Sequence, residues 1–137
     1  MTKAQRRWVY SPPKPFAGQV PASLKAEVQR KANELIEATL KPRYVQPPPT
    51  NPQFNYIVDI YTKWYRHYFY FCAKYCVSGP NALAPDFEAK FARLEYTGKD
   101  RFDLSFMRYT EEWIEVYPDL SLEQCLKAIR EDPMFQP

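Results

Sequence analysis

The feature that most constrains this 137-residue chain is a run of aromatic residues at positions 55–77. The run reads NYIVDIYTKWYRHYFYFCAKYCV and contains nine Tyr, Phe or Trp residues. Aromatic side chains carry large apolar surfaces and are mostly buried in folded proteins. We therefore expect this segment to form the middle of the fold.

Two secondary structures fit the run. Its polar residues recur mostly at spacings of three and four, which is typical of an amphipathic helix. However, β-branched and aromatic side chains crowd against the preceding turn of a helix and pack well on a pleated sheet, so the composition favours strands. A strand is usually about 3 to 10 residues long, so the run is too long for one strand and would have to fold back as a hairpin. The two strands would lie at about residues 55–64 and 67–77, with a turn near Tyr65 and Arg66. We favour the hairpin and keep the helix as the alternative.

A helix is predicted on either side of the run. Apolar residues at helical spacing predict the first over residues 22–40, where Pro21 suits the first turn and Pro42 ends the helix. The second begins after Ser121, an N-cap residue that forms a capping box with Gln124.

Three further strands are predicted between the aromatic run and the second helix. In the clearest of them, alternation places Phe102, Leu104 and Phe106 on one face, which we expect to pack against the first helix. The fold is thus predicted to be α+β, an antiparallel β-meander of about five strands flanked by an N-terminal and a C-terminal α-helix. The three strands are predicted at residues 87–96, 101–109 and 113–117.

The residues before the first helix are predicted to form a separate part. Residues 1–20 contain Pro12, Pro13 and Pro15 and no apolar period, which predicts an extended, proline-rich basic arm. Deletion of residues 1–15 is predicted to leave the fold intact. Residues 21–137 are then a single α+β domain. Prolines that follow the first helix are interpreted as a stiff spacer: Pro47, Pro48, Pro49 and Pro52.

Composition limits the compartment and the class of partner. The chain has no run of about 18 apolar residues, and its charged start is not followed by an apolar segment, so neither a membrane span nor a secretory signal is predicted. Three cysteines are then expected as reduced thiols in a cytoplasmic protein. The net charge of +3 and the pI near 8.7 are below the strongly basic range typical of nucleic-acid-binding domains.

Cys72 and Cys76, together with His67, are candidate metal ligands. On a strand the two cysteines lie about 13 Å apart at ~3.3 Å per residue, too far to share one ion, whereas a helix would bring them together. Because strands are favoured, we predict buried cysteines, no metal and no cofactor.

Asp59 and His67 are the candidates for catalysis. His67 is the only histidine, and on a strand its side chain points away from that of Cys72, so no nucleophile with a histidine base is predicted. Asp59 is a candidate general base if burial raises its pKa, but a salt bridge to Lys63 or Arg108 is the commoner outcome. The sequence therefore favours a protein without enzymatic activity.

The arm supplies the remaining candidate site. Arg6, Arg7, Trp8 and Tyr10 combine cations with aromatic rings, as proteins that bind single-stranded nucleic acid do. The simpler interpretation is a solubilising arm that Trp8 and Tyr10 pin to the body. We predict a small non-enzymatic binding or interaction module with a protein partner, and keep a nucleic-acid-binding accessory protein as the alternative.

Several segments combine aromatic, basic and helical patterns: residues 40–43, 89–96, 102–108 and 122–132, and the pair Trp113 and Tyr117. In these segments the chain resembles a family of short bacterial proteins known as domain of unknown function 3024. The resemblance covers about residue 22 to the end. It implies a fold similar to the predicted one and no particular activity, since that family has no established function.

Overall fold

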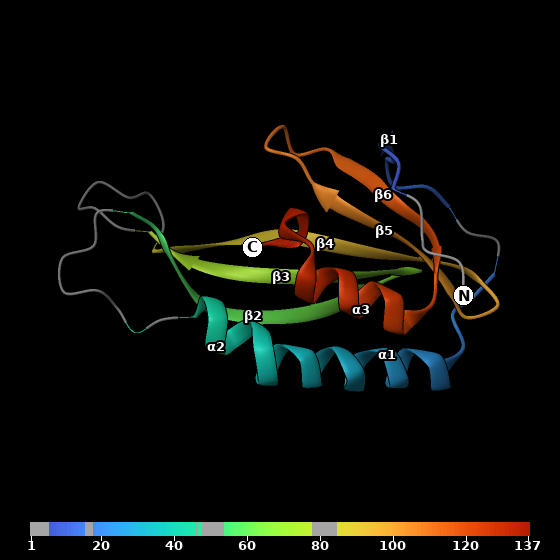
Figure 1. The fold of residues 1–137 in the computed structure, drawn as a ribbon, viewed down its shortest axis with the longest axis horizontal. Helices are drawn as coiled ribbons and strands as arrows, with labels where there is room; N and C mark the ends of the chain where they lie inside the picture. The colour runs from blue at the N-terminus through green and yellow to red at the C-terminus, as the bar shows by residue number, and fades with distance from the viewer. Residues whose placement is uncertain (1–5, 16–17, 46, 48–53, 78–84) are drawn as a thin grey trace.

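The computed structural model describes residues 6–15, 18–45, 47, 54–77 and 85–137. Within these residues the chain forms a six-stranded antiparallel sheet in the order β1-β6-β5-β4-β3-β2, with helices packed on one face (Figure 1). The strands are β1 (Val9–Tyr10), β2 (Tyr56–Tyr65), β3 (Tyr68–Cys76), β4 (Asp86–Gly98), β5 (Arg101–Met107) and β6 (Trp113–Leu120). The helices are α1 (Ala22–Leu35), α2 (Lys41–Tyr44) and α3 (Leu122–Glu131).

The aromatic run forms the β2–β3 hairpin, as predicted. Tyr65 pairs with Tyr68 across a two-residue turn. Phe69 belongs to the core that includes the helices, whereas Tyr70 belongs to a separate cluster on the opposite face of the sheet. Because β3 is buried on both faces, its apolar residues run continuously instead of alternating with polar ones.

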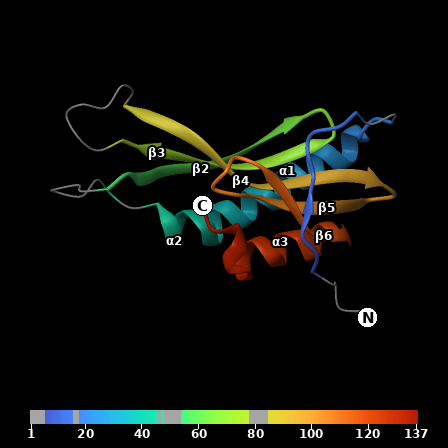
Figure 2. The same ribbon diagram turned by 90° about the horizontal axis from the view of Figure 1, so that it is seen from above.

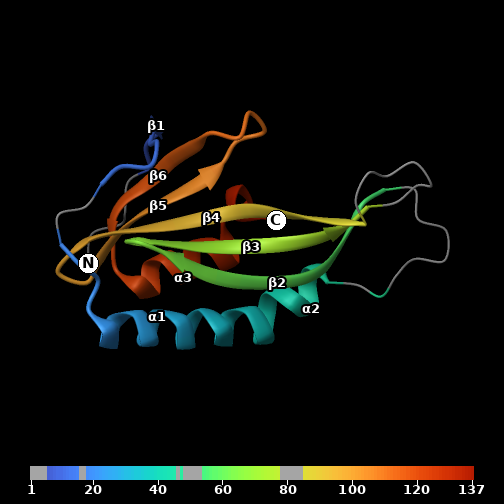
Figure 3. The ribbon, with the colours of Figure 1, turned by 180° about the vertical axis from the view of Figure 1, so that it is seen from behind.

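The helices and one face of the sheet enclose the main core, and the view from behind shows the sheet in front of α3 (Figure 3). Phe102 and Leu104 of β5 are fully buried in this core and Phe106 is partly buried, so the predicted inward face of β5 is confirmed. The predicted packing of this strand against the first helix holds only in that both contribute to one core. In the meander α1 lies along β2, three strands from β5, and α3 covers β5 and β6.

The sheet has one strand more than the predicted count of about five. The additional strand is β1, which comes from the arm and pairs with the edge of β6. An isolated polyproline segment has no hydrogen-bond partners of its own, whereas the Trp8 to Ser11 part of the arm contains no proline and can therefore join a ladder.

The first helical segment continues beyond its predicted end at Pro42 as far as Tyr44. A π-helical turn at Ile36–Leu40 precedes the proline, and there the Lys41 N–H donates to the Ile36 oxygen, five residues back. The wider turn moves the main-chain carbonyls away from the proline ring, so Pro42 occupies the first turn of α2 without breaking the helix.

The second predicted helix is confirmed as α3, and its capping box is present. Ser121 Oγ accepts from the Gln124 N–H at 3.2 Å, and Gln124 Oε1 accepts from the Ser121 N–H at 2.9 Å. None of the described helices is long and apolar enough to cross a membrane.

Some predicted features lie outside the described residues. They are the start of the arm at residues 1–5, the spacer prolines Pro48, Pro49 and Pro52, and the turn at residues 78–81.

Candidate functional site

The arm is attached to the sheet through β6 and then crosses it. Val9 lies opposite Glu115, and the Ser11 N–H donates to the Trp113 oxygen at 2.9 Å. From β1 the chain passes across the sheet toward the start of α1 (Figure 2). The arm therefore covers part of the sheet face that lies away from the helices, which we call the helix-free face.

A fully buried arginine lies beneath the arm. Arg93 Nη2 donates to the main-chain oxygen of Ser11 at 2.8 Å and to its hydroxyl at 3.0 Å. The guanidinium lies 4.7 Å from the ring centroid of Tyr68 and 5.0 Å from that of Trp113, so aromatic faces supply much of its environment. Burial lowers the pKa of Arg93. The arm is thus held by a charged side chain that it screens from water.

His67 also lies next to the arm. Its Nε2 is 3.4 Å from Glu95 Oε2, and the Lys14 Nζ is 3.4 Å from the same oxygen, while His67 and Glu95 are both buried. Burial lowers the pKa of His67, and the neighbouring Glu95 carboxylate opposes that effect. The main-chain N–H of Lys14 donates to the Tyr68 hydroxyl at 2.8 Å. These contacts position the imidazole beside residues of the arm and of β4.

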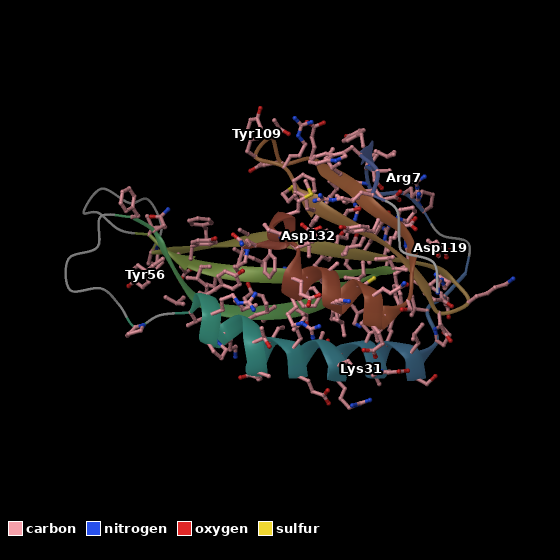
Figure 4. The ribbon with its side chains drawn as sticks, viewed as in Figure 1. Arg7, Lys31, Tyr56, Tyr109, Asp119 and Asp132 are labelled. Carbon is pink, nitrogen blue, oxygen red and sulfur yellow. The ribbon has the colours of Figure 1, made fainter. Side chains whose placement is uncertain are left out.

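The two predicted binding arginines already have carboxylate partners. Arg6 pairs with Asp132, which follows α3, at 3.3 Å, and Arg7 pairs with Glu115 of β6. Figure 4 labels Arg7 and Asp132. Burial raises the pKa of Glu115, and the hydrogen bond from Arg7 opposes that effect. The positive charge of both arginines is therefore largely balanced within the chain.

The predicted aromatic binding residues remain exposed. Trp8 and Tyr10 each keep 57% of their surface in water, and Val9 between them keeps 44%. Trp8 contacts the Phe106 ring edge to face, with centroids 5.2 Å apart. The expectation that Trp8 and Tyr10 pin the arm is only partly met, since Ser11 and Lys14 make the contacts with buried groups.

Asp59 lies apart from His67, on β2. Its Oδ1 accepts from the Ile60 N–H at 2.9 Å and lies 3.5 Å from the Lys41 Nζ. The carboxylate is half exposed, and its partner is neither of the two basic residues suggested by the sequence. The structure therefore does not bring the two catalytic candidates together.

An open groove of about 380 Å³ on the helix-free face has basic and aromatic walls that include Lys63, Tyr70 and Lys90. Glu88 sits between the lysines, 2.7 Å from the Lys63 Nζ and 3.5 Å from the Lys90 Nζ. Hydrogen bonds from Lys63 and Tyr61 hold the pKa of Glu88 at about 2. The carboxylate thus stays ionised and offsets the basic charge of this groove.

The cysteines show the features of packed side chains. Cys72 is fully buried on β3 opposite Tyr61, and burial raises its pKa to about 11, so the thiol is protonated at neutral pH. Cys76 is partly buried near the end of the same strand. In the part of the chain that the structure describes, no three His, Cys, Asp or Glu side chains are grouped to hold a metal ion.

The buried charges of the helix-free face, Arg93 and Glu95, were not predicted from the sequence. Arg93 and Glu95 alternate with the apolar residues of β4, which is the pattern of a strand with one face in water. The arm removes that face from water, although Ser11 precedes Arg93 by 82 positions in the chain. The aromatic residues within the basic arm were the one signal that it touches the body.

The family model of Domain of unknown function (DUF3024) matches residues 20–137. The chain belongs to the DUF3024 family. This match includes all elements from α1 to α3, whereas the binding residues predicted in the arm precede the matched part of this DUF3024 protein. No curated protein and no solved structure matches the chain.

Proposed function

We propose that this DUF3024 protein is a non-enzymatic interaction module that binds an extended segment of a partner protein alongside β1. The observation that carries this proposal is the exposure of three consecutive apolar residues on a terminal strand. Trp8, Val9 and Tyr10 retain between 44% and 57% of their surface in water. Large exposed apolar side chains at one edge of a sheet are typical of interaction sites.

The main chain of β1 is suited to strand addition. The amides of Val9 and Ser11 are on the β6 side, as the pairing of Val9 with Glu115 and the hydrogen bond from Ser11 indicate. Amide directions alternate along an antiparallel strand, so those of Trp8 and Tyr10 point to the outer edge. An extended peptide placed there gains main-chain hydrogen bonds and contacts with alternate side chains.

The opposite edge of the sheet is less accessible. On β2, Asp59 accepts from the Ile60 N–H, which satisfies an amide of the edge strand. The adjoining helices also reach this strand, through the hydrogen bond from Gln29 to Thr62 at 2.6 Å. Side chains of this kind block strand addition, which leaves β1 as the favoured docking edge.

The residue types at β1 fit a protein partner better than a nucleic acid. Trp, Tyr and Arg are the residues most enriched at energetically important positions of protein interfaces. Binding to nucleic acid requires cations that can neutralise phosphates. Arg6 and Arg7 are instead paired with Asp132 and Glu115. The nucleic-acid alternative therefore has the weaker physical support.

The test is a comparison of three baits in pull-downs from the native host. Trp8→Ala combined with Tyr10→Ala removes the aromatic edge, and Tyr65→Ala is the matched control because Tyr65 is also 57% exposed but lies at the β2–β3 turn. We expect a protein that the wild type and the control retain and the double variant loses. Purified with that partner, the wild type should show slowed amide exchange at Trp8 and Tyr10.

Other outcomes would overturn the proposal. If all three baits captured the same protein equally, the aromatic residues at β1 would not be needed for binding. Dimerisation that the double variant abolishes, measured by analytical ultracentrifugation, would make a second copy the occupant. Binding to single-stranded oligonucleotides that weakens steeply with salt and requires Arg6 and Arg7 would favour the nucleic-acid alternative.

A further inference from the structure

A second site lies away from β1, where the start of α1 meets the β2–β3 turn. An open pocket of about 520 Å³ occurs here, and its walls include Gln19, Lys25, Arg66 and His67. The volume falls in the range of roughly 300–1,000 Å³ that small-molecule sites occupy. Its polar walls come from three parts of the chain, the segment before α1, α1 itself and the turn.

Among the described residues that line the pocket, Lys25 and Arg66 are cations and none is a carboxylate. Within the described parts of the chain, neither Lys25 nor Arg66 forms an ion pair. Each cation instead lies over an aromatic ring, Lys25 Nζ 5.5 Å from the Trp64 ring and Arg66 Cζ 5.2 Å from the Tyr65 ring. Lysines elsewhere, such as Lys41, pair with carboxylates. The two pocket cations therefore remain available to an anion from solution.

The backbone at Arg66 is unusual for an arginine. Its φ of 56° lies in the left-handed region, which glycine and asparagine adopt more readily than long side chains. Lys99, Asp100, Glu111 and Asp119 adopt the same region, so this conformation alone does not mark a site, and a tight hairpin turn accounts for it. The turn places Arg66 among the residues that line the pocket.

The first turn of α1 adds to the positive potential. Lys25 belongs to that turn and Val20 just before it also lines the pocket. The turn contains no acidic residue, and Pro21 provides no side-chain cap. Main-chain N–H groups at a helix start attract anions, so this end of α1 reinforces the charge of Lys25 and Arg66.

We propose that this pocket binds a small phosphate-bearing molecule, with Lys25 and Arg66 contacting the phosphate oxygens. A guanidinium presents parallel donors that match a phosphate, and an ammonium adds a mobile point charge. The pocket is much larger than the roughly 30 Å³ that one water occupies in the liquid, so part of an organic group fits beside the phosphate. This site and its ligand are independent of the docking edge at β1.

His67 provides a built-in probe, because it is the only histidine of the chain and lines the pocket. The charged groups near it are Glu95 and Arg93 from β4 and Lys14 from the arm, while Arg66 of the same turn and Lys25 of α1 line the same pocket. A bound anion favours the imidazolium form. Phosphate binding should therefore shift the single imidazole Cε1–H signal in NMR spectra and raise the pKa of His67.

The experiment titrates the protein with inorganic phosphate and with AMP, against sodium chloride at equal ionic strength. We expect saturable shifts of the His67 signal with both phosphates and none with chloride. Tighter binding of AMP supports an organic phosphate as the ligand, and equal binding supports recognition of the phosphate group alone. No saturable shift with either phosphate would overturn the proposal.

Variants of the pocket cations test whether the shift of the His67 NMR signal reports phosphate bound in this pocket. Arg66→Asn suits the left-handed turn and should keep the fold while it weakens phosphate binding at least tenfold, and Lys25→Met tests the second cation from a different element. Arg108→Asn is the matched control, because Arg108 also lies over a neighbouring tyrosine ring, at 5.9 Å, but outside the pocket. Unchanged binding in both pocket variants, or an equal loss in the control, would overturn the proposal.

Discussion

Arg93 donates a hydrogen bond of 2.8 Å to the main-chain oxygen of Ser11, and this contact joins the centre of the sheet to the N-terminal arm. The guanidinium is completely buried, and the arm is part of its cover. The pattern of residues 1–15 predicts a dispensable arm, because it contains no apolar period. In the structure Arg7 and Ser11 donate main-chain hydrogen bonds to β6, and Lys14 donates one to Tyr68, so we expect the arm to contribute to stability.

Deletion of residues 1–15 should therefore destabilise the protein. The deletion removes β1, the hydrogen bonds of Arg7 and Ser11 to β6, and the acceptors of Arg93. At about 0.5–1.5 kcal/mol for each hydrogen bond, the expected loss is roughly 2–4 kcal/mol in urea-induced unfolding. Ser11→Ala is the control, since it keeps the main-chain acceptor and should cost about 1 kcal/mol or less. A deletion that costs less than about 1 kcal/mol would show that the arm contributes little.

Alanine substitutions on the inward face of β5 should lower the free energy of unfolding by different amounts. Phe102 is fully buried beside Tyr96, whereas Phe106 is partly buried and contacts the exposed Trp8. Phe102→Ala should cost about 3–5 kcal/mol through lost transfer energy and a cavity, and Phe106→Ala about half as much because its site is open to solvent. Denaturant melts measure both. Equal losses would mean that the arm seals the site of Phe106.

The sequence predicts the fold well where local patterns agree with the final packing. The alternation of Phe102 and Leu104 and the capping box of Ser121 depend on neighbours within a few residues, and both are confirmed. The β2–β3 turn lies at Arg66 and His67, one residue later than predicted, and no glycine marks it. Long-range contacts are different, because the pairing of β1 with β6 joins segments about 100 residues apart and leaves no periodic signal in either.

The candidate site was predicted less completely for the same reason. Residue type identified the arm and His67, but the partners of Arg7, His67 and Asp59 depend on which strands lie side by side. Arg93 was not singled out because a charged residue in an alternating strand normally faces water. The pocket cations Lys25 and Arg66 come from segments 41 positions apart, so only the fold brings them together.

The capping box of α3 should make a measurable contribution to stability. Ser121→Ala removes the acceptor for the Gln124 N–H and should cost about 1 kcal/mol in urea melts. Ser121→Asp retains a side-chain acceptor at the N-cap and should stay within about 0.5 kcal/mol of the wild type. If the alanine variant is as stable as the aspartate variant, water replaces the cap without loss.

Stability should decrease on mild acidification because of His67. Burial lowers the pKa of His67 in the folded protein, whereas the unfolded chain titrates near the ordinary value of about 6.5. As pH falls through 6.5, the unfolded state takes up a proton that the folded state does not, so the free energy of unfolding decreases. One proton accounts for at most about 1.4 kcal/mol per pH unit. Urea melts between pH 7.5 and 5.5, in buffers without phosphate, measure the slope.

His67→Gln isolates this effect from the titration of carboxylates such as Glu115, which both proteins share. The variant should be less sensitive to pH over the same range, because it lacks the group that is protonated only on unfolding. If Glu95 dominated the environment of His67, the folded state would bind the proton more tightly, and the wild type would gain stability relative to His67→Gln as pH falls. The sign of the difference between the two slopes therefore decides whether burial or the Glu95 carboxylate controls the imidazole.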